Sequence, residues 1–470
     1  MAGAAGLVVT GDLPTTGTMQ GFHDYKQEEN VAFDRIMKIA EQTFKRHGFT
    51  PLYPRPVEPV AYLTKGEGGE EITKQVFGVA RLTTKEITHL GLPFDRTVPL
   101  ASWMVRHANE VILPYKRYNT DISWRGESAQ PGRYRGFYQA DADIVSKNIT
   151  PICDAEGIAI INDVLEELTI GDFVFLVNHI AIPKSMIKQL DLSKEDEAQT
   201  LRIIDKMDKL PHEEITDQIF KLKSNKKSIE EVKKLVDFFN FKGDLKEFQT
   251  IIKVDETAKA GFYDLTKIFG ALEILQVKKE RISFCPGMVR GLEYYSGMVV
   301  ETFLQGEKDG KKLSEYGSIA SGGRYDNLVG SLAEKTERSA SKFEDIKGTG
   351  ISIGLTRLFD ICIRHNLLPI KKKTTSQIMV GYRDKSLLPI AIKAADVLRR
   401  EKGLSVDLYS IEDDKIKKQL TYASKNEIND VLLVMDEKSI VIRNLKEKFQ
   451  LDLPSLEVAI EKISLDFIQK

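Results

Sequence analysis

The sequence predicts a multidomain α+β protein that ends in a separate α/β domain. At 470 residues the chain is long enough for two or three domains. Two strand-like segments joined by a Gly/Pro-containing loop lie between Tyr118 and Val145, the pattern of an antiparallel pair. After Ser376, apolar strand-like segments alternate with helical ones, which predicts a small parallel or mixed α/β domain.

Composition sets limits on partners and compartment. The 68 basic and 69 acidic residues nearly cancel, so a nucleic-acid partner would have to meet a local basic patch. The cysteines Cys153, Cys285 and Cys362 are too widely spaced for a disulfide framework or a metal site, which predicts a reducing compartment. No apolar stretch is long enough to cross a bilayer, so no membrane association is expected. Residues 1–19 resemble neither a secretion signal nor a transit peptide, and a disordered tail is predicted there.

The N-terminal part begins with a predicted helix. Apolar residues recur on one helical face from Asn30 to Phe44, and Gly48 ends the pattern. Further on, Asp95 and Thr97 lie two residues apart, before a second helical pattern. Either residue could cap that helix, and the acid could instead receive an ammonium group.

The antiparallel pair carries polar side chains in an ordered pattern. In its second strand Gln139, Asp141 and Asp143 alternate with apolar residues and therefore share one face. Arg125 ends the first strand, and Arg133 lies in the loop that follows. A strand face with this many polar side chains is normally solvated. Because it lies beside arginines that can clamp a polyphosphate, it could instead line a cleft in which acidic and basic side chains complement each other.

Residues 190–277 are rich in Lys and Glu and show helical periodicity. Ser228 and Glu231 form a capping box at the start of one helix. Four clustered lysines either form a solvated face or contact a nucleic-acid backbone: Lys221, Lys223, Lys226 and Lys227.

Three glycine-containing segments present arginines. Residues 290–297 begin with an arginine, contain two adjacent tyrosines and precede a strand-like run. They could border a pocket for a phosphate or carboxylate, or form a surface turn with aromatic packing. A second glycine turn spans residues 321–328, and residues 348–359 combine a glycine-rich strand with a helix that carries Arg357. The glycine spacing of the last segment fits neither the phosphate loop that ends in Lys-Ser/Thr nor a dinucleotide fingerprint.

Taken in this order, the segments resemble the histidyl-tRNA synthetases, a family of class II aminoacyl-tRNA synthetases. Residues 124–139 resemble motif 2 of that class, and residues 354–358 resemble motif 3. Residues 290–297 and 322–326 resemble the two histidine-specific peptides of the family. The resemblance extends from Gly21 to Ile463.

The resemblance implies an α+β catalytic domain, with a six- or seven-stranded antiparallel sheet flanked by helices, in a homodimer. A helical insertion domain over the acceptor stem and a C-terminal α/β anticodon-binding domain are also implied. The expected boundaries are 1–19 for the tail, 20–189 and 278–368 for the catalytic domain, 190–277 for the insertion, 369–375 for a linker and 376–470 for the anticodon-binding domain.

The implied reaction is ATP-dependent activation of L-histidine to histidyl-adenylate, followed by transfer to the 3′ end of tRNA-His. The substrate carboxylate is itself the nucleophile, so catalysis consists of positioning and charge neutralisation. Magnesium is expected to arrive with ATP, and no metal-ligating residue is assigned. The expected compartment is the cytoplasm, with an organelle as the alternative.

The resemblance assigns roles residue by residue. The residues implied in catalysis are Arg290, Arg125 and Gln139, where the two arginines face the α-phosphate and the glutamine lies near the substrate carboxylate. ATP is assigned to Arg125, Glu127, Arg133 and Arg357, the last of these on the γ-phosphate. Histidine is assigned to Asp95 and Thr97 at the ammonium group, to Arg125 and Gln139 at the carboxylate, to Arg290, which faces the α-phosphate, and to Asp143 as the acidic acceptor of the imidazole, with Tyr294, Tyr295 and Tyr325 lining the pocket.

Two alternative functions belong to other classes of protein. One is a non-catalytic, histidine-binding regulatory paralogue that supports ATP phosphoribosyltransferase. Such paralogues typically lack the catalytic arginines and the anticodon-binding domain, which this chain retains. The other is a sensor of uncharged tRNA, which is normally fused to a kinase, and this sequence contains no kinase motif.

Overall fold

The computed structural model describes residues 19–64, 73–81, 89–128, 130, 132–207, 210–252, 255–289, 295–335, 343, 345–412 and 415–463. These residues fall into two compact units. One lies within Met1–His23 and Ile36–Leu368, and the other within Asp24–Arg35 and Pro369–Lys470. Except for Met19, the tail predicted at residues 1–19 lies outside the described residues.

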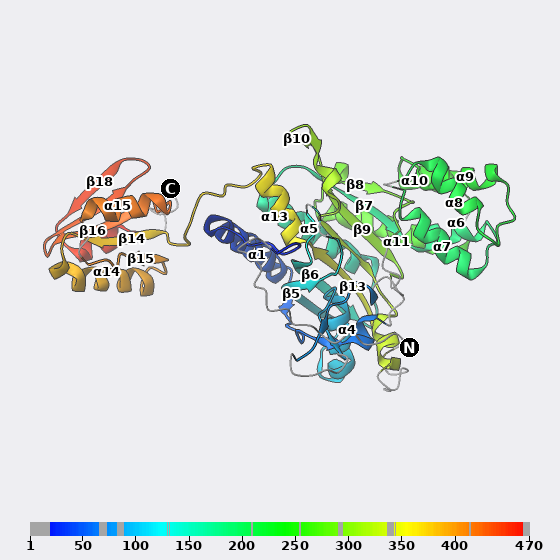
Figure 1. Ribbon diagram of the computed structural model, residues 1–470, viewed down its shortest axis with the longest axis horizontal. Coiled ribbons are helices and arrows are strands. Elements are labelled where there is room, and N and C mark those ends of the chain that lie inside the picture. The colour runs from blue at the N-terminus through cyan, green and yellow to red at the C-terminus, as the bar shows by residue number, and fades with distance from the viewer. Residues whose placement is uncertain are drawn as a thin grey trace. The chain divides into compact units, whose positions relative to one another are not determined.

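An eight-stranded sheet forms the centre of the first unit (Figure 1). In spatial order its strands are β1 (Thr50–Pro51), β5 (Tyr115–Trp124), β6 (Gly136–Ser146), β13 (Lys347–Ile353), β12 (Ala320–Arg324), β9 (Met298–Leu304), β7 (Phe173–His179) and β8 (Ile282–Phe284). The six inner strands are antiparallel to their neighbours. The edge strands β1 and β8 pair in parallel.

The predicted antiparallel sheet flanked by helices is confirmed in the six inner strands, but the whole sheet differs from the six or seven antiparallel strands expected. The described sheet has eight strands, and it is mixed at both edges. The two additional strands are only two and three residues long. Segments this short contain too few residues to show the alternation that identifies a strand.

Helices and two small β elements surround the sheet. The helices are α1 (Gln27–Arg46), α2 (Val60–Thr64), α4 (Thr97–His107), α5 (Pro151–Leu168), α12 (Leu328–Lys335) and α13 (Leu355–Arg364). A three-stranded sheet contains β2 (Glu58–Pro59), β4 (Leu90–Gly91) and β3 (Gly78–Val79), and a hairpin joins β10 (Glu307–Lys308) to β11 (Lys311–Lys312). Of these helices, α5 packs against β13 and α13 packs against β6.

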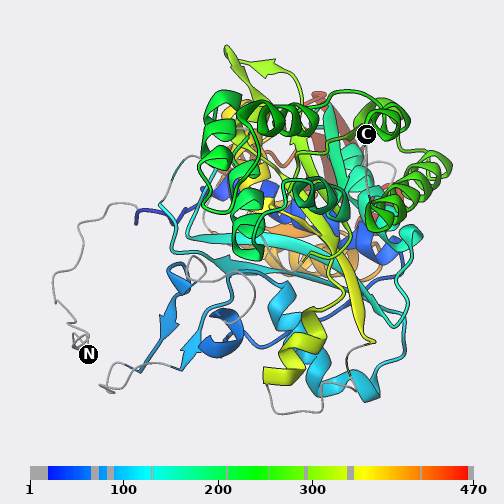
Figure 2. The ribbon, with the colours of Figure 1, turned by 90° about the vertical axis from the view of Figure 1, so that its right-hand side faces the viewer.

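A group of six helices occupies the segment between β7 and β8. These are α6 (Ala181–Lys188), α7 (Lys194–Ile204), α8 (His212–Phe220), α9 (Ile229–Phe239), α10 (Leu245–Ile251) and α11 (Glu256–Ile274). Figure 2 shows them (green) facing the viewer. The capping box predicted at Ser228 and Glu231 is confirmed at the start of α9.

The second unit contains a mixed five-stranded sheet in the order β15 (Val406–Leu408), β14 (Ile378–Tyr382), β16 (Asp430–Asp436), β17 (Ser439–Asn444) and β18 (Phe449–Leu453). Its helices are α14 (Leu388–Arg400), α15 (Ile416–Lys425) and α16 (Leu456–Lys462). The strands β14, β15 and β16 are parallel, whereas β17 and β18 continue antiparallel. The predicted α/β character of this region is confirmed.

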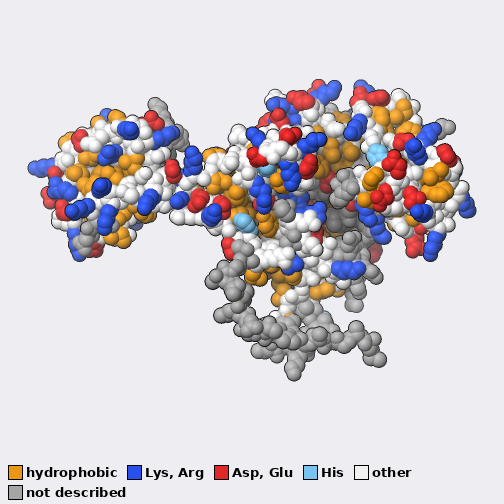
Figure 3. Space-filling view, turned by 45° about the horizontal axis from the view of Figure 1, so that its top comes forward, with side chains coloured by type: hydrophobic (Ala, Val, Ile, Leu, Met, Phe, Trp, Pro, Cys, Tyr) orange, Lys and Arg blue, Asp and Glu red, His pale blue; other side chains and the backbone are white. Residues whose placement is uncertain are grey.

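The visible surface carries no extended region of one charge. Figure 3 shows Lys and Arg side chains interspersed with Asp and Glu, as expected for a net charge of −1. Among the described helices, none is both long and apolar enough to span a membrane.

Candidate active site

One cavity in the first unit, with a volume of about 1420 Å³, collects the residues singled out in the sequence. Its floor is the central sheet. Ten of the predicted site residues line it: Asp95, Thr97, Arg125, Glu127, Arg133, Gln139, Asp143, Tyr295, Tyr325 and Arg357. The other two, Arg290 and Tyr294, lie outside the described residues.

The polar face of β6 forms part of this floor. Gln139, Asp141 and Asp143 all line the cavity, so the alternation predicted from the sequence is confirmed. Gln139 donates from Nε2 to the hydroxyl of Ser352 on β13, at 2.7 Å. This bond orients the amide and leaves Gln139 Oε1 without a hydrogen-bond partner among the described residues.

Asp95 precedes α4, and its two carboxylate oxygens differ in their hydrogen bonding. Its Oδ1 accepts a hydrogen bond from the backbone N–H of Val98 at 3.0 Å, in the manner of a helix cap. Its Oδ2 is buried and has no hydrogen-bond partner in the described part of the chain. Burial raises the pKa of Asp95, and the nearby Arg125 opposes that rise. One carboxylate can therefore cap the helix and still accept from a ligand, so the two interpretations of this residue are compatible.

Another part of the cavity contains three guanidinium groups, those of Arg125, Arg133 and Arg357. The Arg125 side chain lies over the ring of Phe137 with 5.1 Å between Cζ and the ring centroid, and its Nε donates to the carbonyl of Phe94 at 3.0 Å. Arg357 donates to the carbonyls of Gly132 (3.0 Å) and Ser318 (2.7 Å).

The positive charges in this cluster affect one another. The pKa of Arg357 falls to about 10, chiefly because of burial, and the proximity of Arg133 and Arg125 lowers it further. Since repulsion among cations costs free energy, this part of the cavity favours an anion.

A buried ion pair lies at the other end of the β6 row. Asp143 Oδ2 is 2.6 Å from a terminal nitrogen of Arg117, and Asp143 Oδ1 accepts from the Tyr325 hydroxyl at 2.5 Å. Two glycines of β13 provide the space. A methyl group at Gly350 would overlap the Asp143 carboxylate, and one at Gly348 would overlap the Tyr325 ring. These close approaches explain the glycine-rich sequence of this strand.

Several cavity residues were not among the predicted site residues. Asp141, Ser352 and Glu301 line the cavity, and residues of the helical segment contribute as well: Ile204, Asp205, Met207, Phe239 and Asn240. The alternation of β6 already indicated the position of Asp141. No local signal identified the others, because they reach the cavity from elements distant in sequence.

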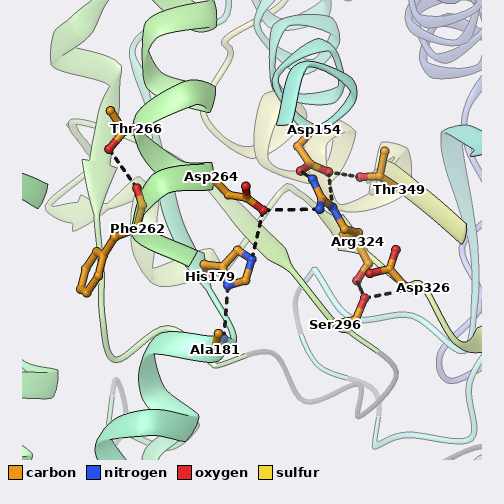
Figure 4. Close-up of polar contacts among 10 residues, drawn as sticks. All are labelled: Asp154, His179, Ala181, Phe262, Asp264, Thr266, Ser296, Arg324, Asp326 and Thr349. Atoms are coloured by element: carbon orange, nitrogen blue, oxygen red, sulfur yellow. Dashed lines mark hydrogen bonds and ion pairs between the residues drawn. The ribbon is translucent and has the colours of Figure 1, made fainter. Parts of the chain in front are cut away.

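A second charge network is centred on Arg324 (Figure 4). Arg324 extends between Asp154 on α5 and Asp264 on α11, and Thr349 donates to Asp154 at 2.7 Å. The Arg324 carbonyl accepts from the backbone N–H of Ser296 at 2.8 Å, and the Ser296 hydroxyl accepts from the N–H of Asp326 at 2.8 Å. The network thereby fixes the residues next to Tyr295 and Tyr325.

The site combines a cationic region suited to phosphates with a region of carboxylate and amide acceptors suited to the nitrogens of an amino acid. No group of three or more potential metal ligands occurs among the described residues. No histidine is among the described residues that line the cavity, and burial raises the pKa of Cys285, the cysteine that lines it. An antiparallel sheet that bears such a site, flanked by helices and followed by an α/β domain, is the architecture of a class II aminoacyl-tRNA synthetase.

Comparison with known proteins identifies the family. The family model for histidyl-tRNA synthetase matches residues 21–358. A histidine–tRNA ligase of Clostridium tetani is 30% identical over 96% of this chain and 99% of its own length, and one of Nostoc punctiforme is 29% identical over 96% and 98%. The crystal structure of histidyl-tRNA synthetase from a Nostoc species matches with a TM-score of 0.79 at 27% identity, covering 96% of this chain and all of the other. The chain belongs to the histidyl-tRNA synthetase family.

A further solved structure shares the fold. A Bacillus halodurans protein described as an ATP phosphoribosyltransferase regulatory subunit/histidyl-tRNA synthetase matches with a TM-score of 0.68 at 18% identity. At that identity the match shows only a shared fold.

Proposed function

We propose that this chain activates L-histidine with ATP and transfers it to the 3′ end of tRNA-His. The observation that carries the proposal is the position of Arg125. It lines the same cavity as Asp95, on the amino-acid side, and Arg357, on the cationic side; its charge opposes the rise in the pKa of Asp95 and adds to the fall in the pKa of Arg357. Arg125 therefore lies where an amino acid and a triphosphate would meet.

In the first step, an oxygen of the histidine carboxylate attacks the α-phosphorus of ATP. The bond between the α-phosphorus and the bridging oxygen breaks, and pyrophosphate leaves. The carboxylate is ionised at neutral pH, so no protein base is needed. Arg125 neutralises charge on the α-phosphate and the attacking carboxylate, while Arg357 and Arg133 hold the outer phosphates. Magnesium enters as part of the MgATP substrate.

Positioning the histidine requires acceptors for its ammonium group. Asp95 Oδ2, Gln139 Oε1 and the Thr97 hydroxyl lie in the same cavity and can accept the three ammonium hydrogens, so we assign Gln139, which the resemblance places near the carboxylate, to the ammonium group as well. Tyr295 and Tyr325 border the side-chain pocket. Arg290 and Tyr294 keep the roles that the resemblance assigns to them, at the α-phosphate and the imidazole.

In the second step, a hydroxyl of the terminal ribose of tRNA attacks the carbonyl carbon of histidyl-adenylate, and AMP leaves. We assign binding of the acceptor stem to the insertion at residues 190–277, and recognition of the anticodon to residues 376–470. The catalytic domain comprises residues 20–189 and 278–368, followed by a linker at 369–375. The functional assembly we propose is a homodimer, which light scattering coupled to gel filtration would test.

Histidine-dependent exchange between ATP and pyrophosphate tests the function directly. We expect exchange with L-histidine and none with the other amino acids. A regulatory paralogue would bind histidine by calorimetry without supporting exchange, and that result would refute the enzymatic assignment. Charging of a tRNA-His transcript, with another tRNA as control, then tests the second step.

A further inference from the structure

A β-hairpin reaches the cavity from the segment between β9 and β12. Its turn, Asp309-Gly310, has the sequence that favours a two-residue type I′ turn, and both residues have positive φ angles, 54° and 73°. The turn places Lys308 opposite Lys311. A short 3₁₀ helix, η3 (Leu313–Tyr316), follows the hairpin. Lys311 lines the cavity together with the end of η3, so this segment forms part of the cavity wall.

One buried histidine side chain fixes this segment. His365 directly follows α13, and its side chain is 5% exposed. Its Nδ1 lies 3.0 Å from a carboxylate oxygen of Asp309, and its Nε2 lies 3.0 Å from the Tyr316 hydroxyl. Since a carboxylate only accepts, the Nδ1–H donates to Asp309, and in the neutral ring Nε2 accepts from Tyr316. A single imidazole therefore holds both the turn of the hairpin and the end of η3.

The helix that precedes this histidine also carries Arg357, in its first turn. Arg357 Nη1 donates to the Ser318 carbonyl at 2.7 Å. A methyl group at Gly317, the residue after η3, would lie 3.5 Å from the same nitrogen. The two ends of α13 thus contact one continuous segment, and these contacts place the hairpin at the cationic part of the cavity.

Lys311 is the cation that the hairpin brings to this wall. Its Nζ lies over the Tyr316 ring, 4.6 Å from the ring centroid, which is a cation–π distance. Within the part of the chain that the structure describes, Lys311 takes part in no ion pair, although Glu315 also lines the cavity. The carboxylate of the neighbouring turn, Asp309, is bonded to His365 instead. An aromatic ring orients a cation without neutralising it, so Lys311 keeps its charge for a ligand.

The position of Lys311 indicates an anion beside the arginines of the phosphate region. Arg357 already donates from Nε and Nη1 to backbone carbonyls, and Arg133 lies 3.8 Å from the Glu127 carboxylate. Part of their donor capacity and charge is therefore used within the protein. A terminal phosphate carries about two negative charges at neutral pH, more than one guanidinium group can neutralise. A lysine adds a compact charge with three donors on a flexible stem, which can follow a phosphate as it leaves.

We propose that Lys311 is a further phosphate-binding residue of the nucleotide site. It contacts the terminal phosphate of ATP and then the pyrophosphate that contains this phosphate. The inference rests on the proposed function and deepens it. Asp309, Tyr316 and His365 act only through Lys311, because they hold the hairpin and the ammonium group in place.

The test compares Lys311→Gln with a matched control, Lys312→Gln. Lys312 is the next residue of β11 and is also exposed, but it does not line the cavity. Successive side chains of a strand point to opposite faces, so the control removes the same charge from the other side of the hairpin. Lys311→Arg keeps the charge and serves as the rescue variant. Calorimetry would measure the dissociation constants of MgATP, AMP and L-histidine at one ionic strength, and melting curves would confirm folding.

For Lys311→Gln we expect MgATP to bind about 3- to 20-fold more weakly, the loss typical of a charge-assisted contact at a partly exposed site. The KM for ATP in pyrophosphate exchange should rise by a similar factor. AMP lacks the outer phosphates, so its affinity should stay within about twofold of the wild type, as should that of histidine. Lys311→Arg and the control should both retain the wild-type affinity for MgATP.

The inference can fail separately from the proposed function. If the wild type supports histidine-dependent exchange, a loss of MgATP affinity below about threefold in Lys311→Gln, or an equal loss for AMP or in the control, would refute the role of Lys311 alone. A variant that binds MgATP normally but has a raised KM for tRNA-His in charging would assign Lys311 to the polynucleotide and overturn the inference. A wild type that neither binds MgATP nor supports exchange would refute both the inference and the proposed function.

Discussion

Removing Arg324 should destabilise the first unit strongly, because it would leave Asp154 charged and buried. The Asp154 side chain is fully buried, and Arg324 provides its only cation among the described ion pairs. Breaking a buried pair by deleting one partner costs about 3–5 kcal/mol. Domain stabilities are about 5–15 kcal/mol, so Arg324→Met should lose a large share of the free energy of unfolding.

The loss should depend on pH in a defined direction. Burial already raises the pKa of Asp154, and Arg324 opposes that rise, so the variant carboxyl should have a still higher pKa. An acid whose pKa is raised on folding destabilises the fold above its unfolded pKa, and protonation relieves the effect. The difference between variant and wild type should therefore shrink as the pH falls from 8 towards 5.

Urea unfolding followed by tryptophan fluorescence would measure the effect. The two tryptophans, Trp103 and Trp124, both lie in the first unit. The double variant Arg324→Met/Asp154→Asn is the control, since the amide is neutral and can still accept from Thr349. It should be more stable than Arg324→Met alone. A single variant within about 1 kcal/mol of wild type, or a double variant that recovers nothing, would refute the reasoning.

Three further predictions follow from the site and its surroundings. Gly350→Ala should raise the KM for histidine in pyrophosphate exchange at least about tenfold and leave the KM for ATP unchanged. The reason is that the new methyl group overlaps the Asp143 carboxylate, which supports the pocket. Equal changes in both KM values would contradict this prediction. Arg357→Ala should lower kcat of exchange by about 10²- to 10³-fold through lost charge stabilisation, and near-wild-type turnover would remove Arg357 from the phosphate site. Hydrogen bonds that the protonated His47 ring donates to Asp163 and Glu156 raise the pKa of His47 to about 9. Its contribution to stability, about 1–2 kcal/mol after allowance for solvent screening, should be complete below pH 6.5 and disappear as the pH rises to 9. Melting temperatures of His47→Gln and wild type should then converge across that range, and a constant gap would argue against the role of His47.

The sequence by itself determined the features that depend on local periodicity and on turn chemistry. A strand alternates its side chains with a period of two, so Gln139, Asp141 and Asp143 were placed on one face before any neighbour was known. The capping box at Ser228 is likewise a property of four consecutive residues. Arg125 and Arg357 were assigned to ATP because their segments resemble motifs 2 and 3 of the class II synthetases.

Only the tertiary structure decided which of these residues meet. Strand β13 follows β6 by about two hundred residues and yet pairs with it, which sets Ser352 beside Asp141 and Gly350 beside Asp143. Strand order is fixed by the packing of the whole sheet and its helices, and no single segment encodes it. The protonation of Asp141 is likewise decided by the tertiary structure, because burial in the fold is what raises its pKa. Two carboxylates that look equivalent in the sequence thus become different in the fold, since Arg117 is adjacent to one of them and pairs with it.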